Sequence, residues 1–277
     1  VVRWLEDKAY GEKPFFIALG LQKPHVPFLA PDKYFDLYPF DRITYQPDRP
    51  NLWDFLPPSA ISKRYEAFGF ELAKENHALR KEYMQAYHAC VSFIDAQLGL
   101  VIDSLKKQGL WDDTIIIFTS DHGYHLGDHF IWGKVTLFDI GAKVPFIVRA
   151  PGLSKSGTAS EAMVELIDIY PTLADLAGLK APDHLQGISL RPLLGHPDRL
   201  GKRKYAYSVV TRGPKNLGYA LRNQNWRYGK WPDGEELYNL RTDPQEKNNL
   251  AQKDHLKERL QDFREILVEK QNLFEKN

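Results

Sequence analysis

Residues 114–118 form a short apolar run rich in β-branched side chains, and a cluster of polar, chemically capable residues follows it at once. Such a run predicts a buried strand. Upstream, apolar residues recur at three- and four-residue steps from about 76 to 108, which predicts a helix that ends near Gly109. A helix followed by a buried strand is a unit of an α/β sheet. We therefore expect an α/β fold.

The polar cluster after this strand offers ligands for a cation and a charge for an anion. Asp121, His122 and Lys134 lie where ligands bind in open α/β sheets, just beyond the carboxyl end of a strand. An Asp-His pair suits zinc as readily as calcium, and calcium prefers six to eight oxygen ligands, so this pair alone cannot complete a calcium site. Spacing alone also allows Asp121 to be a turn carboxylate and Lys134 an exposed loop lysine. The favoured chemistry is attack on a charged ester beside a metal.

Five motifs together carry a specific resemblance. They occupy residues 22–28, 121–123, 127–129, 132–134 and 236–250. In this order they resemble the sulfatase family of the alkaline-phosphatase superfamily, in particular its iduronate-2-sulfatase branch. The resemblance implies an alkaline-phosphatase-like mixed sheet flanked by helices, with a smaller C-terminal subdomain of antiparallel sheet plus helix.

The resemblance also implies roles for catalytic and metal-binding residues. It makes Asp121 a ligand of a calcium ion, with magnesium a less frequent alternative, and it implies that His122 binds this metal or lies beside it. It places Lys134 against the sulfate group, where an ammonium stabilises the charge that develops in the transition state. It makes His25 a sulfate contact and general acid, a role suited to a side chain with a pKa near neutrality. A purely structural loop histidine is the other interpretation of His25.

A further set of side chains is expected to bind the substrate, on weaker grounds. The set consists of Lys23, His125, His129 and Trp132. Each could instead be a solvated charge, a supporting hydrogen-bond partner or core packing. Many relatives have glycine where this chain has Phe130, so the backbone around His129 is a point of departure from the family pattern.

The nucleophile motif of the family is absent from this sequence. Sulfatases carry Cys-X-Pro/Ala-X-Arg, whose cysteine or serine becomes formylglycine, whereas the one cysteine here, Cys90, lies in an unrelated context and fits a helix core. We expect this chain to be the C-terminal two-thirds of a longer sulfatase, inactive alone, with formylglycine on an N-terminal segment outside it. The resemblance implies a periplasmic, secreted or lysosome-like location, although no signal is present.

The chain texture predicts two domains. We expect residues 1–198 to belong to the catalytic α/β domain and residues 199–277 to form a small α+β subdomain, because Gly, Pro and basic residues cluster near 195–203. Further predicted strands span residues 14–20, 144–149 and 161–167, and a helix spans 170–177 with Asp168 as its N-cap. In the small subdomain we expect strands at 205–211, 219–222, 226–230 and 236–240, followed by a helix at 255–274.

Composition excludes some classes of partner. The 277 residues carry a net charge of +1, which gives no global attraction to nucleic acid. No apolar stretch approaches the roughly 18 residues that a membrane span needs. The expected partners are a sulfated sugar or another sulfate ester, together with the N-terminal segment of the same protein.

Three functions therefore compete. The leading prediction is a sulfuric ester hydrolase acting on a sulfated glycan, such as one containing 2-sulfated iduronate. A phosphomonoester or phosphonate hydrolase would share the fold and the Asp-His-Gly motif. A non-catalytic glycan-binding module would explain the absent nucleophile differently, by saturable binding without turnover.

Overall fold

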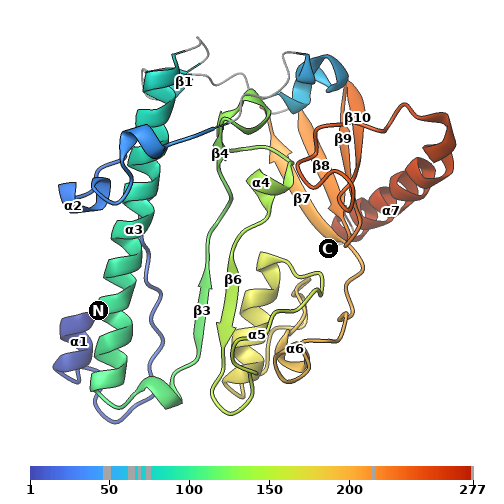
Figure 1. The fold of residues 1–277 in the computed structure, drawn as a ribbon. Helices are drawn as coiled ribbons and strands as arrows, with labels where there is room; N and C mark the ends of the chain where they lie inside the picture. Colours follow the sequence, from blue (N-terminus) through green and yellow to red (C-terminus); the bar gives the residue numbers. More distant parts are fainter. Residues whose placement is uncertain (46–50, 62–65, 68–69, 73–75, 214–215, 276–277) are drawn as a thin grey trace. The chain divides into compact units, whose positions relative to one another are not determined.

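The structure is a computed structural model that describes residues 1–277 except 46–50, 62–65, 68–69, 73–75, 214–215 and 276–277 (Figure 1). It divides into two compact units. The first comprises Val1–Pro47 and Arg64–Thr114, and the second comprises Asp48–Lys63 and Ile115–Asn277. The predicted domain boundary between residues 198 and 199 falls inside the second unit and stays a prediction.

The first unit is organised around one long helix. Helix α3 spans His77–Lys107, and the side chain of its N-cap, Asn76, accepts a hydrogen bond from the Leu79 amide at 3.0 Å. This confirms the helix predicted at 76–108. The unit's other elements are α1 (Val2–Glu6), α2 (Asp32–Phe35), the 3-10 turns η1 (Phe40–Arg42) and η4 (Trp111–Asp113), and the paired strands β1 (Glu66–Ala67) and β2 (Phe70–Glu71).

Helix α3 also meets the length and composition of a membrane-spanning helix. The same test is passed by core helices, and α3 buries Tyr83, Ala89, Cys90 and Leu105. Both α1 and α2 contact it. These elements cover only part of the helix, since 22% of its most apolar 18-residue stretch is buried, and one helix of this kind is weak evidence for a membrane span.

The strand predicted at residues 14–20 is wrong. These residues adopt no regular secondary structure, and Phe16 and Leu19 are exposed. An apolar run forms a strand only where another strand pairs with it. Within the described residues no strand does so here, so the run stays irregular.

The second unit begins with a two-stranded antiparallel ladder that runs through the centre of Figure 1. Strand β3 (Ile116–Thr119) pairs with β6 (Phe146–Arg149), with Thr119 opposite Phe146. These strands confirm the predictions at 114–118 and 144–149. Strands β4 (His125–Leu126) and β5 (Trp132–Gly133) form a hairpin around the 3-10 turn η5 (Asp128–Phe130), and α4 (Asp139–Ala142) follows.

The strand predicted at residues 161–167 is also wrong. The chain instead turns into η6 (Leu166–Asp168), which a capping box stabilises. The Glu165 side chain accepts a hydrogen bond from the Asp168 amide, and the Asp168 side chain accepts one from the Glu165 amide. Helix α5 (Ile169–Leu176) follows, with Asp168 at its N-cap position as expected and Gly178 beyond its end. Helix α6 spans Arg191–Gly195, and the 3-10 turns η2 (Leu52–Phe55) and η3 (Pro58–Ala60) also belong to this unit.

The C-terminal part confirms the predicted antiparallel sheet plus helix. Its four strands, in spatial order β10-β9-β8-β7, are β7 (Ala206–Thr211), β8 (Leu217–Arg222), β9 (Trp226–Trp231) and β10 (Gly234–Asn239). After the turn η7 (Asp254–Leu256), helix α7 (Lys257–Glu275) packs on this sheet through Leu260, Phe263 and Leu267 (Figure 1). The fold is thus mixed α/β. Within the described residues, β3 and β6 form a two-stranded antiparallel sheet and β7 to β10 a four-stranded one.

Candidate active site

Three predicted site residues lie together just beyond β3. Asp121 and His122 come two and three residues after the strand ends at Thr119. The Oδ2 atom of Asp121 lies 3.3 Å from Nε2 of His122, and Nζ of Lys134 donates a hydrogen bond to the same Nε2 at 3.0 Å. The Asp121 side chain is 83% exposed and the His122 side chain 33% exposed. A carboxylate, an imidazole and an ammonium therefore converge on one accessible spot.

The hydrogen bonds of His122 fix which ring nitrogen carries the proton. Nδ1 lies 2.8 Å from the carbonyl oxygen of Gly123, so Nδ1–H donates to that oxygen. In the neutral ring, Nε2 then keeps its lone pair and faces Lys134 and Asp121. Two electron-pair donors, Nε2 and a carboxylate oxygen, lie side by side, which is an arrangement that a cation stabilises.

This donor set fits part of a metal site. Asp121 supplies a hard oxygen and His122 a nitrogen lone pair, and both are acceptable to a divalent cation. Among the described residues no group of three or more His, Cys, Asp or Glu side chains is arranged to hold a metal. The two residues would therefore hold a metal only together with ligands from elsewhere.

The β4–β5 hairpin delivers Lys134 to the site. His125 pairs with Gly133 and Leu126 with Trp132, so Lys134 follows directly on the last paired residue. Trp132 is 3% exposed and fills the hairpin against Gly127, where a Cβ would come within 2.9 Å of its ring. Trp132 is thus a packing residue in this structure, and its predicted contact with substrate stays a prediction.

The backbone around Lys134 and His129 is unusual. Lys134 lies between Gly133, with φ of 146°, and Val135, with φ of 67°. His129 and Phe130 have φ of 57° and 58°, a left-handed conformation that glycine adopts more easily than phenylalanine. This conformation explains why glycine suits the position of Phe130, where the sequence departs from the family pattern.

His125 and His129 are buried rather than open to solvent. His125 is fully buried, its Nδ1–H donates to the Asp128 carbonyl at 3.0 Å, and its Nε2 accepts from Thr136 Oγ1 at 2.7 Å. Burial, reinforced by the charge of nearby His129, lowers the pKa of His125 to about 3. The His129 ring stacks on Phe138 with centroids 3.9 Å apart. Both rings brace the segment that follows Lys134, and their predicted contact with substrate stays a prediction.

His25 and Lys23 belong to the first unit. His25 is exposed, and its Nδ1 donates to the carbonyl oxygen of Val26 at 2.7 Å. Lys23 Nζ donates to the carbonyl oxygens of His25, at 3.4 Å, and of Pro27, in a loop with cis peptide bonds before Pro24 and Pro27. Nε2 of His25 is thus available for proton transfer, while Lys23 braces the loop that presents it.

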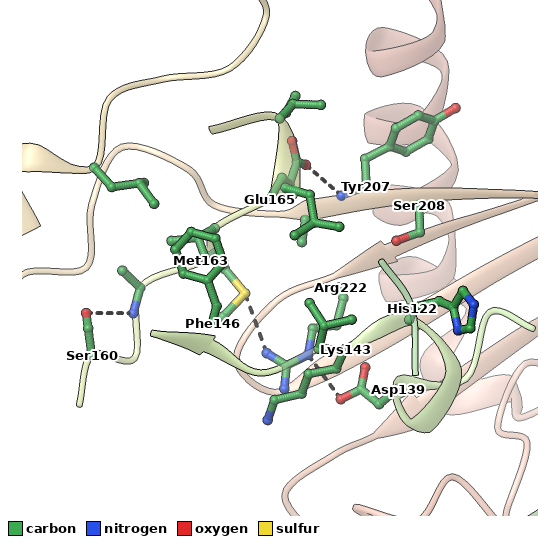
Figure 2. Close-up of a pocket in the computed structure, with 18 of the residues that line it drawn as sticks. His122, Asp139, Lys143, Phe146, Ser160, Met163, Glu165, Tyr207, Ser208 and Arg222 are labelled. Atoms are coloured by element: carbon green, nitrogen blue, oxygen red, sulfur yellow. Dashed lines mark hydrogen bonds and ion pairs between the residues drawn. The ribbon is translucent and has the colours of Figure 1, made fainter. Parts of the chain in front are cut away.

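Asp121 and His122 line one end of a cavity of about 1420 Å³ in the second unit (Figure 2). The charged residues that also line it include Asp139, Lys143 and Arg222, which the sequence did not single out. Arg222 Nε lies 3.2 Å from Asp139 Oδ2, and its Nη1 lies 3.5 Å from the sulfur of Met163. Their only sequence signal was position: Lys143 precedes a predicted strand and Arg222 ends another.

Glu165, another residue that lines this cavity, belongs to a buried ion-pair network. Arg203 contacts Glu165 at 2.7 Å and Asp168 at 2.5 Å, and Glu165 accepts a hydrogen bond from the Tyr207 amide at 2.7 Å (Figure 2). Burial raises the pKa of Glu165, an effect that the Arg203 charge opposes. These contacts connect η6 to β7 beside the cavity.

Two protein-family models match this chain. The model of the family described as Sulfatase matches residues 1–179, and the model described as N-sulphoglucosamine sulphohydrolase, C-terminal, matches residues 127–273. The chain belongs to the sulfatase family.

Individual relatives include curated proteins and a solved structure. The chain is 36% identical to a sulfatase of Formosa agariphila, over 92% of this chain and 50% of the relative, and 30% identical to human iduronate 2-sulfatase, over 90% and 60%. The phosphonate monoester hydrolase of Silicibacter pomeroyi is 26% identical, with a TM-score of 0.86 over 98% of this chain and 58% of that structure. The chain thus spans about half the length of the curated relatives that it matches.

Proposed function

We propose that the intact protein hydrolyses a sulfate ester of a glycan, in the manner of iduronate-2-sulfatases. One observation carries the proposal. The ammonium of Lys134 lies 3.0 Å from the imidazole of His122, which is 3.3 Å from the carboxylate of Asp121, at the end of a strand and beside an open cavity. A positive charge held beside two ligand-type side chains is suited to receive an anionic ester group.

The role of Lys134 follows from the charge of the ester. A sulfate ester carries negative charge on its oxygens, and more charge moves to the bridging oxygen as the S–O bond breaks. An ammonium fixed at this position stabilises that transition state more than the ground state. Lys134 is half-buried, which strengthens this interaction relative to one in bulk water.

Asp121 and His122 would hold a metal ion, with calcium implied by the family. The metal, when bound, would supply additional positive charge for the sulfate oxygens. Nδ1–H of His122 stays hydrogen-bonded to Gly123, so the ring keeps its lone pair on Nε2 for such a role. The remaining ligands and the formylglycine nucleophile would come from outside this chain.

His25 is the proposed general acid for the departing alcohol. Its exposed ring and its Nδ1–H bond to Val26 leave Nε2 to carry and release a proton. The Lys23 side chain binds the carbonyl oxygens on either side of this loop and thereby holds the loop's shape.

The test is release of inorganic sulfate from a 2-sulfated uronate disaccharide by the intact natural protein. We expect Lys134→Ala to lower kcat by about 100-fold or more, since one preorganised group is worth about that factor. Lys180→Ala is the matched control, because Lys180 is an exposed lysine that pairs with Asp183 at 3.3 Å. Turnover of Lys134→Ala at the control rate would remove Lys134 from the mechanism.

A phosphonate or phosphate ester is the second candidate substrate, and the similarity to a phosphonate monoester hydrolase favours keeping it. Parallel assays with a phosphonate monoester and a phosphate monoester decide between them. Saturable binding of the sulfated disaccharide without any turnover would instead favour a glycan-binding module. A periplasmic, secreted or lysosome-like location is part of the proposal, because sulfated glycans are met there.

A further inference from the structure

The segment that follows Lys134 contacts buried residues of the C-terminal sheet region. The amide of Asp139 donates a hydrogen bond to Oε2 of Glu246 at 2.6 Å. The other carboxylate oxygen of Glu246 accepts from Nε of Arg227 on β9. Glu246 is 2% exposed and Arg227 1% exposed, so water does not compete for these bonds.

A second set of contacts joins the same partners. The guanidinium of Arg227 lies over the ring of Phe138 at 4.9 Å, and the His129 ring stacks on the same ring with centroids 3.9 Å apart. His129 Nε2 in turn lies 3.2 Å from the carbonyl oxygen of Glu246. Phe138 and Asp139 are therefore fixed by side-chain, ring and backbone contacts that all lead back to Glu246 and Arg227.

The conformation of the backbone shows why such anchoring matters. Val135, directly after Lys134, has φ of 67°, which is costly for a β-branched residue. Glu246 itself has φ of 54°. Residues in such conformations persist only where the surroundings hold them. Thr136 is held by His125, and Asp139 by Glu246.

We propose that Glu246, paired with Arg227, is a positioning residue that fixes the segment carrying Lys134 in its catalytic place. The role of Lys134 rests on the proposed function, whereas the anchoring itself stands on the contacts. The motif at 236–250 thus contributes to the chemistry from a position that never touches the substrate. Burial raises the pKa of Glu246 to about 7, so the facing Arg227 guanidinium, which lowers it, helps to keep the carboxylate charged.

The variants are Glu246→Asp and Glu246→Gln in the intact protein. Aspartate keeps a negative charge for Arg227 but is one methylene shorter, so it cannot reach both Arg227 and the Asp139 amide. Glu236→Gln is the matched control, because Glu236 is equally buried and contacts Arg227 at 3.4 Å, yet its other hydrogen bonds go to Trp231 and Tyr238.

Two measurements separate positioning from general stability. We expect Glu246→Asp to lower kcat for the sulfated disaccharide about 10- to 100-fold with KM changed less than about threefold, because misplacement of a catalytic group by about 1 Å costs up to that factor. Hydrogen exchange in peptides covering residues 134–143 should become faster. Glu236→Gln should leave kcat within about threefold and leave that exchange unchanged.

A double-variant cycle tests whether Glu246 acts through Lys134. In a Lys134→Ala background, Glu246→Asp should cause no further loss of kcat. An undiminished further loss, a wild-type kcat for Glu246→Asp, or an equal loss in Glu236→Gln would overturn the inference. Absence of sulfate release by the wild-type protein would contradict the proposed function instead, and unchanged exchange at 134–143 would still overturn the anchoring. Glu246→Gln provides the same readouts if Glu246→Asp does not fold.

Discussion

At the scale of single residues, burial separates the histidines of this chain into different chemical types. His122 and His25 retain solvent access, whereas His125 and His129 are enclosed. Three of them lie within the motifs at 22–28, 121–123 and 127–129, and His125 lies between the last two, so their sequence positions alone did not distinguish them. What distinguishes them is the hydrogen-bond partner of each ring nitrogen, which only the folded chain defines.

His125 gives a pH-dependent stability. Its pKa is lowered to about 3 in the folded chain, mainly by burial, against an ordinary value of 6.5. Between these values the unfolded chain binds more protons, so stability is present above about pH 6.5 and is lost as the pH falls toward 3. The contribution to the slope is at most about 1.4 kcal/mol per pH unit for one group.

We expect His125→Asn to flatten the dependence of the free energy of unfolding on pH between 7 and 4, measured by urea titration. His184→Asn is the control, because His184 is exposed. The interpretation fails if His125→Asn retains the full wild-type slope.

At the scale of elements, sequence patterns predicted the regular parts of the fold well and the irregular parts poorly. Helix α3 and the strands β7–β10 have strong periodicity and clear turn signals, and both predictions are confirmed. The runs at 14–20 and 161–167 look equally apolar but form no strands. Whether such a run forms a strand depends on a partner strand or a side-chain cap. A partner strand comes from a distant part of the sequence, so the run itself does not reveal it.

The candidate site shows the same division. The sequence indicated Asp121, His122 and Lys134, and the structure brings them together. It did not indicate Glu246, Arg227 or Arg222 as parts of one arrangement. Glu246 and Arg222 contact Asp139, and Arg227 contacts Phe138, across about 80 to 110 residues of chain. The roles of all these residues stay predictions until variants are assayed.

Helix α7 is expected to contribute much of the stability of the C-terminal sheet region. Phe263 is 3% exposed, stacks on Tyr228 and meets Tyr205 edge-on. Phe263→Ala should lower the free energy of unfolding by about 3–5 kcal/mol, as large core truncations do. Val268→Ala on the same helix should cost far less, because Val268 is 54% exposed. Equal losses in urea unfolding of the two variants would show that α7 does not pack on the sheet as described.

At the scale of the whole molecule, the chain carries charge in local clusters rather than as a global excess. Its net charge is +1, and the site region of the second unit combines Lys134, Lys143 and Arg222 with the carboxylates of Asp121 and Asp139, the latter paired with Arg222. Local positive charge is what an anionic ester needs, since distant surface charges are screened within about 8–10 Å at physiological salt. The composition alone would have concealed this feature.

The chain alone should lack turnover. It contains no Cys-X-Pro/Ala-X-Arg motif, and in the part that the structure describes only Asp121 and His122 are candidate ligands at the site. We expect the 277-residue chain, expressed alone, to release no sulfate from the disaccharide, while the intact natural protein does. Isothermal titration with calcium should likewise show weaker binding by the chain than by the intact protein. Sulfate release by the chain alone would show that its own residues complete the site.

Two glycines set a limit on how this site can change. A Cβ at Gly123 would lie 2.0 Å from the carbonyl oxygen of Ile140, and one at Gly141 would lie 2.2 Å from Thr136 Oγ1. The main chain beside His122 thus touches α4 directly, with a hydrogen bond of 3.0 Å from the Gly123 amide to the Gly141 carbonyl. A randomised library selected for new ester specificity should recover glycine at both positions while the residues lining the cavity diverge. Changes of ester specificity are therefore expected at the other residues that line the cavity and not at Gly123 or Gly141.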